Sequence, residues 1–462
     1  MKQNSTDTAT PPFVDGYRSW LLAVLLLVSS FNYTDRIVFA IMSQSIKQEL
    51  GLTDLQLGLL GGLAFALVYT GFGIPVARLA DRYSRTKIIA AAILVWSLMT
   101  AFCGLAANFW QLLIGRVGVG VGEAGFLPPT ASLLGDTFPP NRRASAMAIV
   151  QLGSPISALA GGVLLAWVGQ ELGWRMAFVV VGLPGIIISL VVYFGLREPQ
   201  RGLIDGLAKP PPTVPLGQAL REIVSKPAMI HVVLAGALAM FGLNSIGLFL
   251  TPFFVRVHGF NLANAGVVFG IVQFIGAVSG LLLGGFGTDA LASKDLRWRA
   301  WGPAIGLLCA MVAYGSGFTQ GDSMPSAGLI LLGSACLFVY FVPSLALVQN
   351  MSGPHSRATA VAVYALVSSI IGTGLGPTLV GLASDLYANA AFHGGSYTAL
   401  CPGGLPGADV SAAVAAACRS AAATGVQRAL ITCTLVFPWA AIHYLLAART
   451  LRRDLYNAAP AA

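Results

Sequence analysis

Charged side chains are scarce in this sequence. Asp, Glu, Lys and Arg make up 10% of its 462 residues, whereas soluble domains carry about 25%. Hydrophobic residues make up 56%, and apolar runs of roughly 20 residues, long enough to cross a bilayer as helices, recur along the chain. The short segments of alternating hydrophobicity that mark a membrane β-barrel are missing. The composition argues against a soluble globular domain and predicts an all-α polytopic membrane protein.

Cysteine is also rare, with six residues. Cys103, Cys309, Cys336 and Cys433 fall inside apolar runs and are interpreted as small core residues. The sequence has no Cys-x-x-Cys motif and no Cys/His cluster, so we expect no metal and no cofactor. It also lacks a nucleophile–base pair and a phosphate-binding loop, which argues against an enzyme. The first 16 residues are polar, so no cleavable signal peptide is expected.

The apolar runs predict twelve transmembrane spans in two groups of six. Their approximate bounds are 17–43, 53–80, 86–107, 109–136, 142–170, 174–196, 227–256, 262–288, 299–319, 326–351, 356–388 and 425–449. We expect tails at 1–16 and 450–462, and one helix bundle each at 17–197 and 227–449. The cytoplasmic linker between the bundles, 198–226, includes the segment 216–224, which can form a short amphipathic helix on the membrane surface.

The distribution of basic residues predicts the orientation. With the N-terminus in the cytoplasm, most of the 27 Lys and Arg residues fall on the cytoplasmic side. Those on the opposite side are Lys47, Arg175, Arg256, Arg419 and Arg428. This asymmetry follows the positive-inside rule, so we expect both termini in the cytoplasm and the protein in the cell's inner (plasma) membrane. The net charge of +9 is then a topology signal, and no nucleic-acid partner is expected.

The longest predicted outer loop, 389–424, contains two further cysteines, Cys401 and Cys418. If the outer side is periplasmic or extracellular, these two residues can form a disulfide. Two free thiols remain the alternative. The alanine-rich stretch 411–423 is expected to form a short surface helix in this loop.

The two groups of spans are related in sequence. Residues 143–149 read Arg-Ala-Ser-Ala-Met-Ala-Ile, and residues 357–363 read Arg-Ala-Thr-Ala-Val-Ala-Val. Two related six-helix halves are typical of secondary transporters, whose binding site lies between the halves near the bilayer midplane. Two further pairs match at nearly the same spacing, namely Asn32 with Asn244 and Asp81 with Asp289.

Four charged residues lie deep within the spans of the first half. Asp35 and Arg36 are in the first span, and Arg116 and Glu123 are in the glycine-rich stretch 112–129, where Pro128 and Pro129 are expected to bend or break the helix. Charges at membrane depth usually mark an ion or substrate pathway. A buried structural ion pair is the alternative. Arg116 and Glu123 share one helix face, and Asp35 is expected at a depth where it can pair with Arg116.

These deep charges suit proton coupling. Burial raises the pKa of a carboxyl and a nearby arginine lowers it, so a carboxyl whose cationic neighbour moves away changes its proton affinity. We therefore predict that Asp35 and Glu123 carry protons. Arg36 is expected to act as a gating partner or as a headgroup contact, because its guanidinium fork suits phosphate.

Three motifs resemble those of the major facilitator superfamily. Residues 77–87, Ala-Arg-Leu-Ala-Asp-Arg-Tyr-Ser-Arg-Thr-Lys, resemble the loop motif G-x-L-A-D-R-x-G-R-K, with Ala77 and Ser84 where glycine is usual. Arg116 with its following glycines is similar to the fourth-helix motif, and Gly153-Ser-Pro155 with Gly161-Gly162 to a fifth-helix antiporter motif. The resemblance implies the superfamily's twelve-helix fold and ion pairs that gate it. To these we assign Arg36, Asp81, Arg82, Arg85, Arg116, Arg143, Asp289 and Arg357.

Within the superfamily, the chain resembles the spinster family. Asn32-Tyr-Thr-Asp35-Arg36 is similar to that family's N-Y-x-D-R signature, and Gly122-Glu123-Ala124 with Pro129 and Asp136 to its G-E-A…P…D stretch. The resemblance implies proton-driven export of lysolipids, such as lysophospholipids or sphingosine-phosphate-like substrates, by an antiporter. We expect a monomer in the lipid bilayer.

An amphiphilic substrate would need a polar site and an apolar surface. We assign the headgroup contacts to Asn32, Tyr33, Arg36, Glu123 and Asn244. For the tail we choose aromatic residues of the second half, Phe249, Phe253, Phe338 and Tyr340, although such runs are also typical of plain helix packing. Two alternatives stay open, namely a superfamily exporter or symporter of a drug or small organic anion, and a non-transporting membrane sensor on the same fold.

Overall fold

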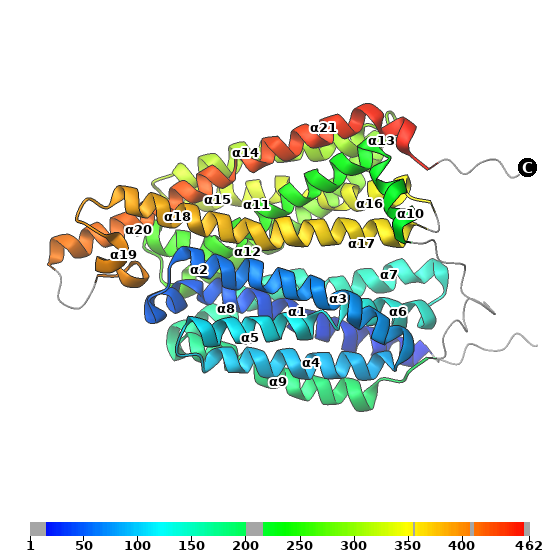
Figure 1. The fold of residues 1–462 in the computed structure, drawn as a ribbon, viewed down its shortest axis with the longest axis horizontal. Helices are drawn as coiled ribbons and strands as arrows, with labels where there is room; N and C mark the ends of the chain where they lie inside the picture. Colours follow the sequence, from blue (N-terminus) through cyan, green and yellow to red (C-terminus); the bar gives the residue numbers. More distant parts are fainter. Residues whose placement is uncertain (1–14, 200–215, 354–355, 407–410, 457–462) are drawn as a thin grey trace, which may run out of the picture.

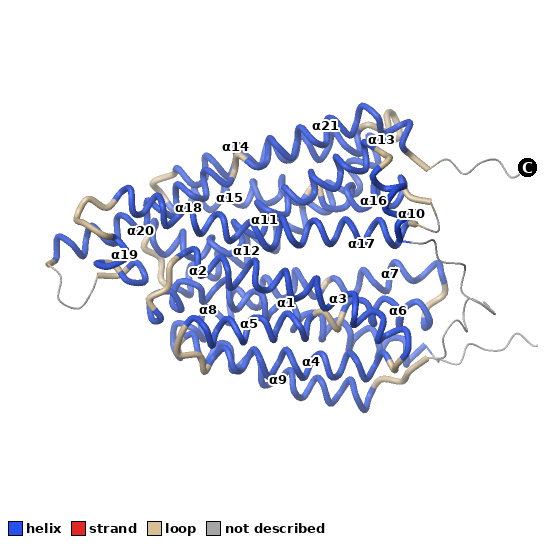
Figure 2. The backbone as a smooth tube through the Cα atoms, viewed as in Figure 1, coloured by secondary structure: helices blue, strands red, loops and turns tan. Residues whose placement is uncertain are grey.

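The computed structural model describes residues 15–199, 216–353, 356–406 and 411–456, and these residues form helices joined by short loops, without a strand (Figures 1 and 2). In the first half the helices are α1 (Asp15–Leu50), α2 (Asp54–Gly58), η1 (Leu59–Leu63), α3 (Ala64–Arg82), α4 (Arg85–Gly104), α5 (Phe109–Glu123), α6 (Leu127–Thr137), α7 (Pro140–Gln151), α8 (Gly153–Leu172) and α9 (Trp174–Gly195).

The second half follows the short linker helix α10 (Leu216–Val224), which was predicted from the amphipathic segment. Its helices are α11 (Pro227–His258), α12 (Leu262–Leu282), η2 (Leu283–Gly287), α13 (Thr288–Ala292), α14 (Trp298–Thr319), α15 (Ser323–Phe338), α16 (Phe341–Met351), α17 (Arg357–Val367), η3 (Ser368–Leu375), α18 (Gly376–Ala391), α19 (Tyr397–Leu400), η4 (Pro402–Gly404), α20 (Ala412–Cys433) and α21 (Val436–Asp454).

Eleven helical stretches among the described residues are long and apolar enough to cross a membrane. The remaining predicted span is the pair α5 and α6, which a turn at Ala124–Phe126 interrupts, because prolines occupy the first turn of α6. The predicted break at Pro128 and Pro129 is therefore present, and it places Glu123 at the last residue of α5. The polytopic all-α fold predicted from composition is confirmed.

One predicted element differs from the structure. The alanine-rich stretch at 411–423 is not a separate surface helix but the first half of α20, which continues without a break towards α21. Alanine has the highest helix propensity, so nothing in this stretch ends a helix. The Ser411 hydroxyl accepts a hydrogen bond from the Val414 N–H and caps the start of α20.

Figure 1 shows the helices running along one long axis, with the two halves stacked across it. We call the end where α9 stops and α10 and the end of α21 lie the linker end. The opposite end, where α2, α19 and the start of α20 lie, is called the disulfide end. At the linker end, the Tyr17 hydroxyl of α1 donates a hydrogen bond to the Arg197 carbonyl after α9.

Two of the contacts that join the halves involve small residues. Helix α8 packs against α12, and α2 with η1 packs against η3 and α18. Glycine allows this close approach: a Cβ at Gly162 of α8 would lie 2.7 Å from Gly270 Cα and 2.8 Å from Gly266 O of α12. In the second contact, the Thr378 hydroxyl donates to the Gly58 carbonyl at 3.1 Å. Small residues thus bring the two halves into backbone contact.

Candidate functional site

A cavity of about 390 Å³ lies between the two halves. Its first-half wall includes Tyr33, Arg36, Phe39, Phe65, Arg116, Gln151 and Ser154, and its second-half wall includes Met240, Asn244, Gly247, Phe269, Gln273, Phe338, Phe341 and Thr373. The first-half wall carries two arginines, whereas the second-half wall is amide, hydroxyl and apolar. The predicted asymmetry between the halves is therefore present in the cavity.

Arg36 and Glu123 form the central ion pair of this wall. Arg36 Nε lies 2.6 Å from Glu123 Oε2, which makes a charge-assisted hydrogen bond between α1 and α5. The Glu123 side chain is fully buried, and the Arg36 side chain remains 32% exposed. The guanidinium also lies over the rings of Phe65 and Tyr69, at 4.8 and 5.0 Å from their centroids. Arg36 thus links a buried carboxylate to the cavity.

Arg116 has a different environment from the one predicted. Its Nε donates to the Leu60 carbonyl of η1 at 3.3 Å, and its guanidinium lies over Phe39 at 4.7 Å and Phe65 at 5.4 Å. Among the described residues it has no carboxylate within 4 Å, so the pair with Asp35 that their similar depth allowed is not formed. The sharing of a helix face with Glu123 does not produce a pair either, because Arg36 of α1 occupies that carboxylate.

Asp35 is buried behind the cavity wall, with 2% exposure. Glu123, Thr100, Arg116 and Arg36 are its electrostatic neighbours. Several buried polar atoms of this region have no hydrogen-bond partner in the part of the chain that the structure describes, namely Ser29 Oγ, Asn32 Nδ2, Asp35 Oδ1, Thr100 Oγ1 and Glu123 Oε1. Such atoms are costly in an apolar interior, and they cluster at functional sites.

The predicted substrate residues divide into two groups. Tyr33, Arg36, Asn244 and Phe338 line the cavity, whereas Asn32 and Glu123 lie behind its wall. Three residues assigned to the tail, Phe249, Phe253 and Tyr340, are not among the residues that line this cavity and belong to the packed core. The Phe253 ring packs against Phe254 and Phe318 with centroids 5.3 and 5.1 Å away, so helix packing explains these aromatics.

Sequence reasoning missed four polar lining residues: Gln151, Ser154, Gln273 and Thr373. Ser154 lies inside the Gly153-Ser-Pro155 motif, which pointed to this place in the chain. Uncharged amides on apolar helices give no comparable signal, because only their rotation about the helix axis decides whether they face a cavity.

The predicted gating residues lie apart from one another. The Asp81 side chain lies outside the described part of the structure, and Arg82 is exposed at the end of α3. Asp289 is exposed and 3.2 Å from Arg299. Arg143 Nε donates to the Phe138 carbonyl at 2.9 Å, and Arg357 Nε donates to the Gln349 carbonyl at 3.3 Å. These two arginines, equivalent in the repeat, each satisfy a carbonyl near the end of the preceding helix.

Arg85 holds the first half together instead of contacting the second. Its fully buried guanidinium pairs with Asp136 and, at 2.6 Å, with Glu198, and it donates to the Ser132 and Pro199 carbonyls. Burial raises the pKa of Glu198, but hydrogen bonds from Arg85 and the Thr86 N–H outweigh burial and hold this pKa below its ordinary value. The loop motif therefore fixes α4, α6 and the segment after α9.

Replacing Arg85 by methionine is expected to destabilise the protein, because Asp136 and Glu198 would lose their shared cation. Breaking a fully buried ion pair costs about 3–5 kcal/mol, and we expect about 2–3 kcal/mol because both carboxylates are partly hydrated. Thermal unfolding followed by tryptophan fluorescence measures the loss. The exposed Arg82→Met is the control from the same loop. Equal unfolding temperatures for the two variants would show that the network contributes no stability.

A second ion network, which the sequence did not reveal, joins the halves at the disulfide end. Arg256 of α11 donates from Nη1 and Nη2 to both carboxylate oxygens of Asp54 at 2.7 and 2.8 Å. Lys47 Nζ lies 2.7 Å from Asp54 Oδ1, and the Asp385 carboxylate of α18 accepts from the N–H groups of Asp54 and Leu55. We call Lys47, Asp54, Arg256 and Asp385 the disulfide-end gate.

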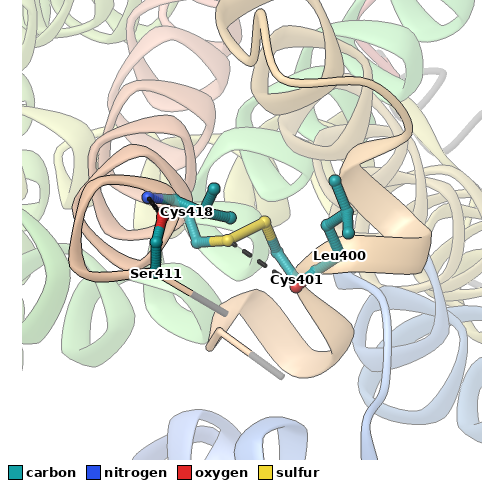
Figure 3. Close-up of a disulfide and its surroundings, with 5 residues drawn as sticks. Leu400, Cys401, Ser411 and Cys418 are labelled. Carbon is teal, nitrogen blue, oxygen red and sulfur yellow. Dashed lines mark hydrogen bonds between the residues drawn. A yellow bond between two sulfur atoms is a disulfide. The ribbon is translucent and has the colours of Figure 1, made fainter. Parts of the chain in front are cut away.

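The structure joins Cys401 and Cys418 in a disulfide, as the sequence allowed (Figure 3). The bond links the residue after α19 to α20, and both sulfurs are buried. Figure 3 also shows the Leu400 carbonyl beside the Cys418 sulfur, at 3.8 Å. The free-thiol alternative does not apply to this structure.

Comparison with known proteins agrees with this geometry. The Major Facilitator Superfamily profile matches residues 25–377. The crystal structure of a bacterial homolog to the human lysosomal transporter Spinster, inward-facing and unoccupied, matches with a TM-score of 0.87 and 33% identity over 97% of this chain and 100% of that one. An MFS-type efflux pump of Mycolicibacterium smegmatis is 32% identical over 80% of this chain and 85% of the pump. The sphingosine-1-phosphate transporter SPNS2 of Danio rerio is 24% identical over 78% and 75%.

Two helical halves around a charged central cavity are typical of membrane transporters. The chain belongs to the Major Facilitator Superfamily and, within it, to the spinster family. The family predicted from the Asn32–Arg36 and Gly122–Ala124 motifs is therefore confirmed.

Proposed function

We propose that this protein is a proton-coupled secondary active transporter that moves anionic amphiphiles, in the first place lysophospholipids or sphingosine-phosphate-like lysolipids, by alternating access. The observation that carries the proposal is the Arg36–Glu123 pair. A partly exposed arginine of the cavity wall lies 2.6 Å from a fully buried carboxylate. The same cation therefore pairs with a protonatable group and is accessible to a substrate in the cavity.

Arg36 can couple the binding of a proton to the binding of an anionic substrate, because a single guanidinium serves both sites. A phosphate in the cavity would compete with the Glu123 carboxylate for this donor. A buried carboxyl that loses its cationic partner binds a proton more readily. Protonation of Glu123 and binding of an anion to Arg36 therefore assist each other, and linkage makes this assistance reciprocal.

Arg116 supplies a second cation for an anionic headgroup. It lines the cavity and lies over Phe39 and Phe65, and no carboxylate of the described part of the chain pairs with it. Asp35, predicted to carry a proton because it is a buried carboxyl, has Arg116 among its electrostatic neighbours. The net charge beside the cavity thus becomes more positive with each proton bound. The side chains that carry this charge are Asp35, Arg36, Arg116 and Glu123.

The opposite wall suits the alkyl chain. Phe269, Leu281, Phe338 and Phe341 line the cavity from α12, α15 and α16. Burying a methylene group contributes about 0.8 kcal/mol, so an acyl or sphingoid chain along this wall would supply much of the affinity. Asn244 and Gln273 also line the cavity, and their amide groups can bind ester or hydroxyl groups of the substrate.

The basic residues support an orientation with the linker end in the cytoplasm of the inner membrane. The disulfide end would then face an oxidising compartment, which suits the Cys401–Cys418 bond. In this orientation the disulfide-end gate closes the cavity from the outside.

Proton flux in proteoliposomes with an internal pH dye tests the proposal. Lysophosphatidic acid or sphingosine-1-phosphate is expected to produce proton movement that depends on the protein. Cooperative binding at Arg36 favours movement of protons with the lipid, whereas antiport gives the opposite sign of pH change, so the sign distinguishes the two modes. Proton movement with no lysolipid but with other solutes would exclude lysolipids as the substrate.

A drug or small organic anion is the second candidate substrate, and the 32% identity to an efflux pump supports export as the direction of transport. The largely apolar cavity suits such compounds as well. Competition shows whether the two candidates use the same site, because excess lysolipid should then suppress drug-dependent proton movement. A lipid transporter should in addition show proton movement when lysolipid is the only solute added.

A further inference from the structure

The segment between α18 and α20 contacts the first half of the protein. Helices α19 and η4 belong to this segment, which we call the disulfide loop (residues 392–406), and η4 packs against the end of α1. Gly403 has a positive φ of 65°, and a Cβ there would lie 2.6 Å from the Lys47 carbonyl oxygen and 3.1 Å from Gln48 Cα. The loop backbone therefore lies directly on α1, with no room for a side chain.

The disulfide loop also lies beside the disulfide-end gate. A Cβ on Gly404 would be 3.5 Å from Lys47 Cε, and the loop residue Tyr397 is 4% exposed. Burial raises the pKa of Tyr397 to about 12, and its electrostatic neighbours are Arg256, Asp54 and Asp385. Because its phenol stays neutral, Tyr397 adds no charge to a network of two cations and two carboxylates.

The gate depends on the exclusion of water. The side chains of Lys47, Asp54 and Arg256 are 2%, 2% and 4% exposed. Opposite charges attract each other more strongly in such an environment than in water. Separating them there would leave an unpaired buried charge, which is energetically costly. Water that reaches the pairs weakens the attraction and lowers the cost of separation. A segment that covers Lys47 therefore stabilises the closed gate.

We propose that the disulfide loop, fixed to α20 by Cys401–Cys418, holds the disulfide-end gate closed by covering Lys47 and binding the end of α1. The loop is part of the second half and α1 is part of the first, so the gate opens only when η4 leaves α1. The disulfide ties the start of η4 to a buried position in α20 and limits this movement. The inference rests on the fold and on alternating access, and it does not depend on the substrate.

Hydrogen–deuterium exchange of the full chain in nanodiscs tests this proposal. The amides of Asp54 and Leu55 report gate opening, because they donate to the Asp385 carboxylate at 2.9 and 2.8 Å. In a Cys401→Ser/Cys418→Ser variant, we expect the peptide covering 52–58 to exchange about tenfold faster than in the wild type, in keeping with local opening. Peptides of α4 and α9 should be unchanged, which distinguishes gate opening from unfolding.

A second variant keeps the disulfide. Gly403→Ala should also increase exchange at 52–58, because its Cβ would displace η4 from the Lys47 carbonyl. The matched control is Gly395→Ala, which has a positive φ of 115° in the same loop but a Cβ whose nearest neighbour is Leu400 Cδ1 at 3.7 Å. The proposal is wrong if the disulfide variant and Gly403→Ala raise exchange only within 392–406. It is also wrong if Gly395→Ala raises exchange at 52–58 as much as Gly403→Ala does.

Discussion

Replacing Glu123 by glutamine is expected to abolish substrate-dependent proton movement while the protein still binds an anionic substrate. Glutamine keeps the size and the hydrogen-bonding oxygen but cannot exchange a proton. It also removes the only carboxylate that pairs with Arg36 among the described residues, so the guanidinium becomes available to the cavity. We expect lysolipid affinity equal to or higher than that of the wild type. Scintillation proximity binding and pH-dye flux on the same preparation measure the two properties.

Asp35→Asn is expected to stop proton movement as well, since it removes the second buried carboxyl. Glu171→Gln serves as the control, because this carboxylate is exposed near the disulfide end of α8. A sensor on the transporter fold would tolerate both buried changes and show no flux in the wild type. Normal coupled flux in Glu123→Gln would remove this residue from the proton pathway and leave the Arg36 pair as a structural contact.

The fold could be predicted because its signals are local. A membrane span needs only length and apolar composition, so α9 at Trp174–Gly195 agrees with the predicted 174–196. The repeat at Arg143 and Arg357 depends on sequence similarity, and both arginines satisfy a carbonyl near the end of a preceding helix. The α20 start was harder to place, because an alanine-rich helix looks the same in water and in the membrane.

The site could be predicted only in part, because pairing depends on how helices rotate against each other. The depth of Arg36 and Glu123 could be estimated from the sequence, but the bond between them depends on how α1 and α5 are rotated about their axes. The gate shows the same limit more clearly. Arg256 and Asp54 are far apart in the chain, and in the sequence each resembles an exposed charge at the end of a span. Only the contact between the halves makes them a buried pair.

The adjacent glycines 161 and 162 allow the sharpest test of the contact between the halves. Gly162→Ala is expected to slow transport about tenfold or more, because overpacking costs about 1–3 kcal/mol when the neighbours cannot move. The atoms that its Cβ would meet are backbone atoms of α12, at 2.7 and 2.8 Å. A shift of the whole helix α8 or α12 is then needed, and this shift separates the halves.

Gly161→Ala is the matched control, since its Cβ would meet only the side chains of Ile37 and Leu165, at 3.5 and 3.6 Å. Both variants add one methyl group to the same buried turn of α8, so their difference isolates the contact with α12. Initial rates of coupled flux and exchange at residues 52–58 should change in Gly162→Ala alone. Equal rates in the two variants would show that the close contact between α8 and α12 does not limit turnover.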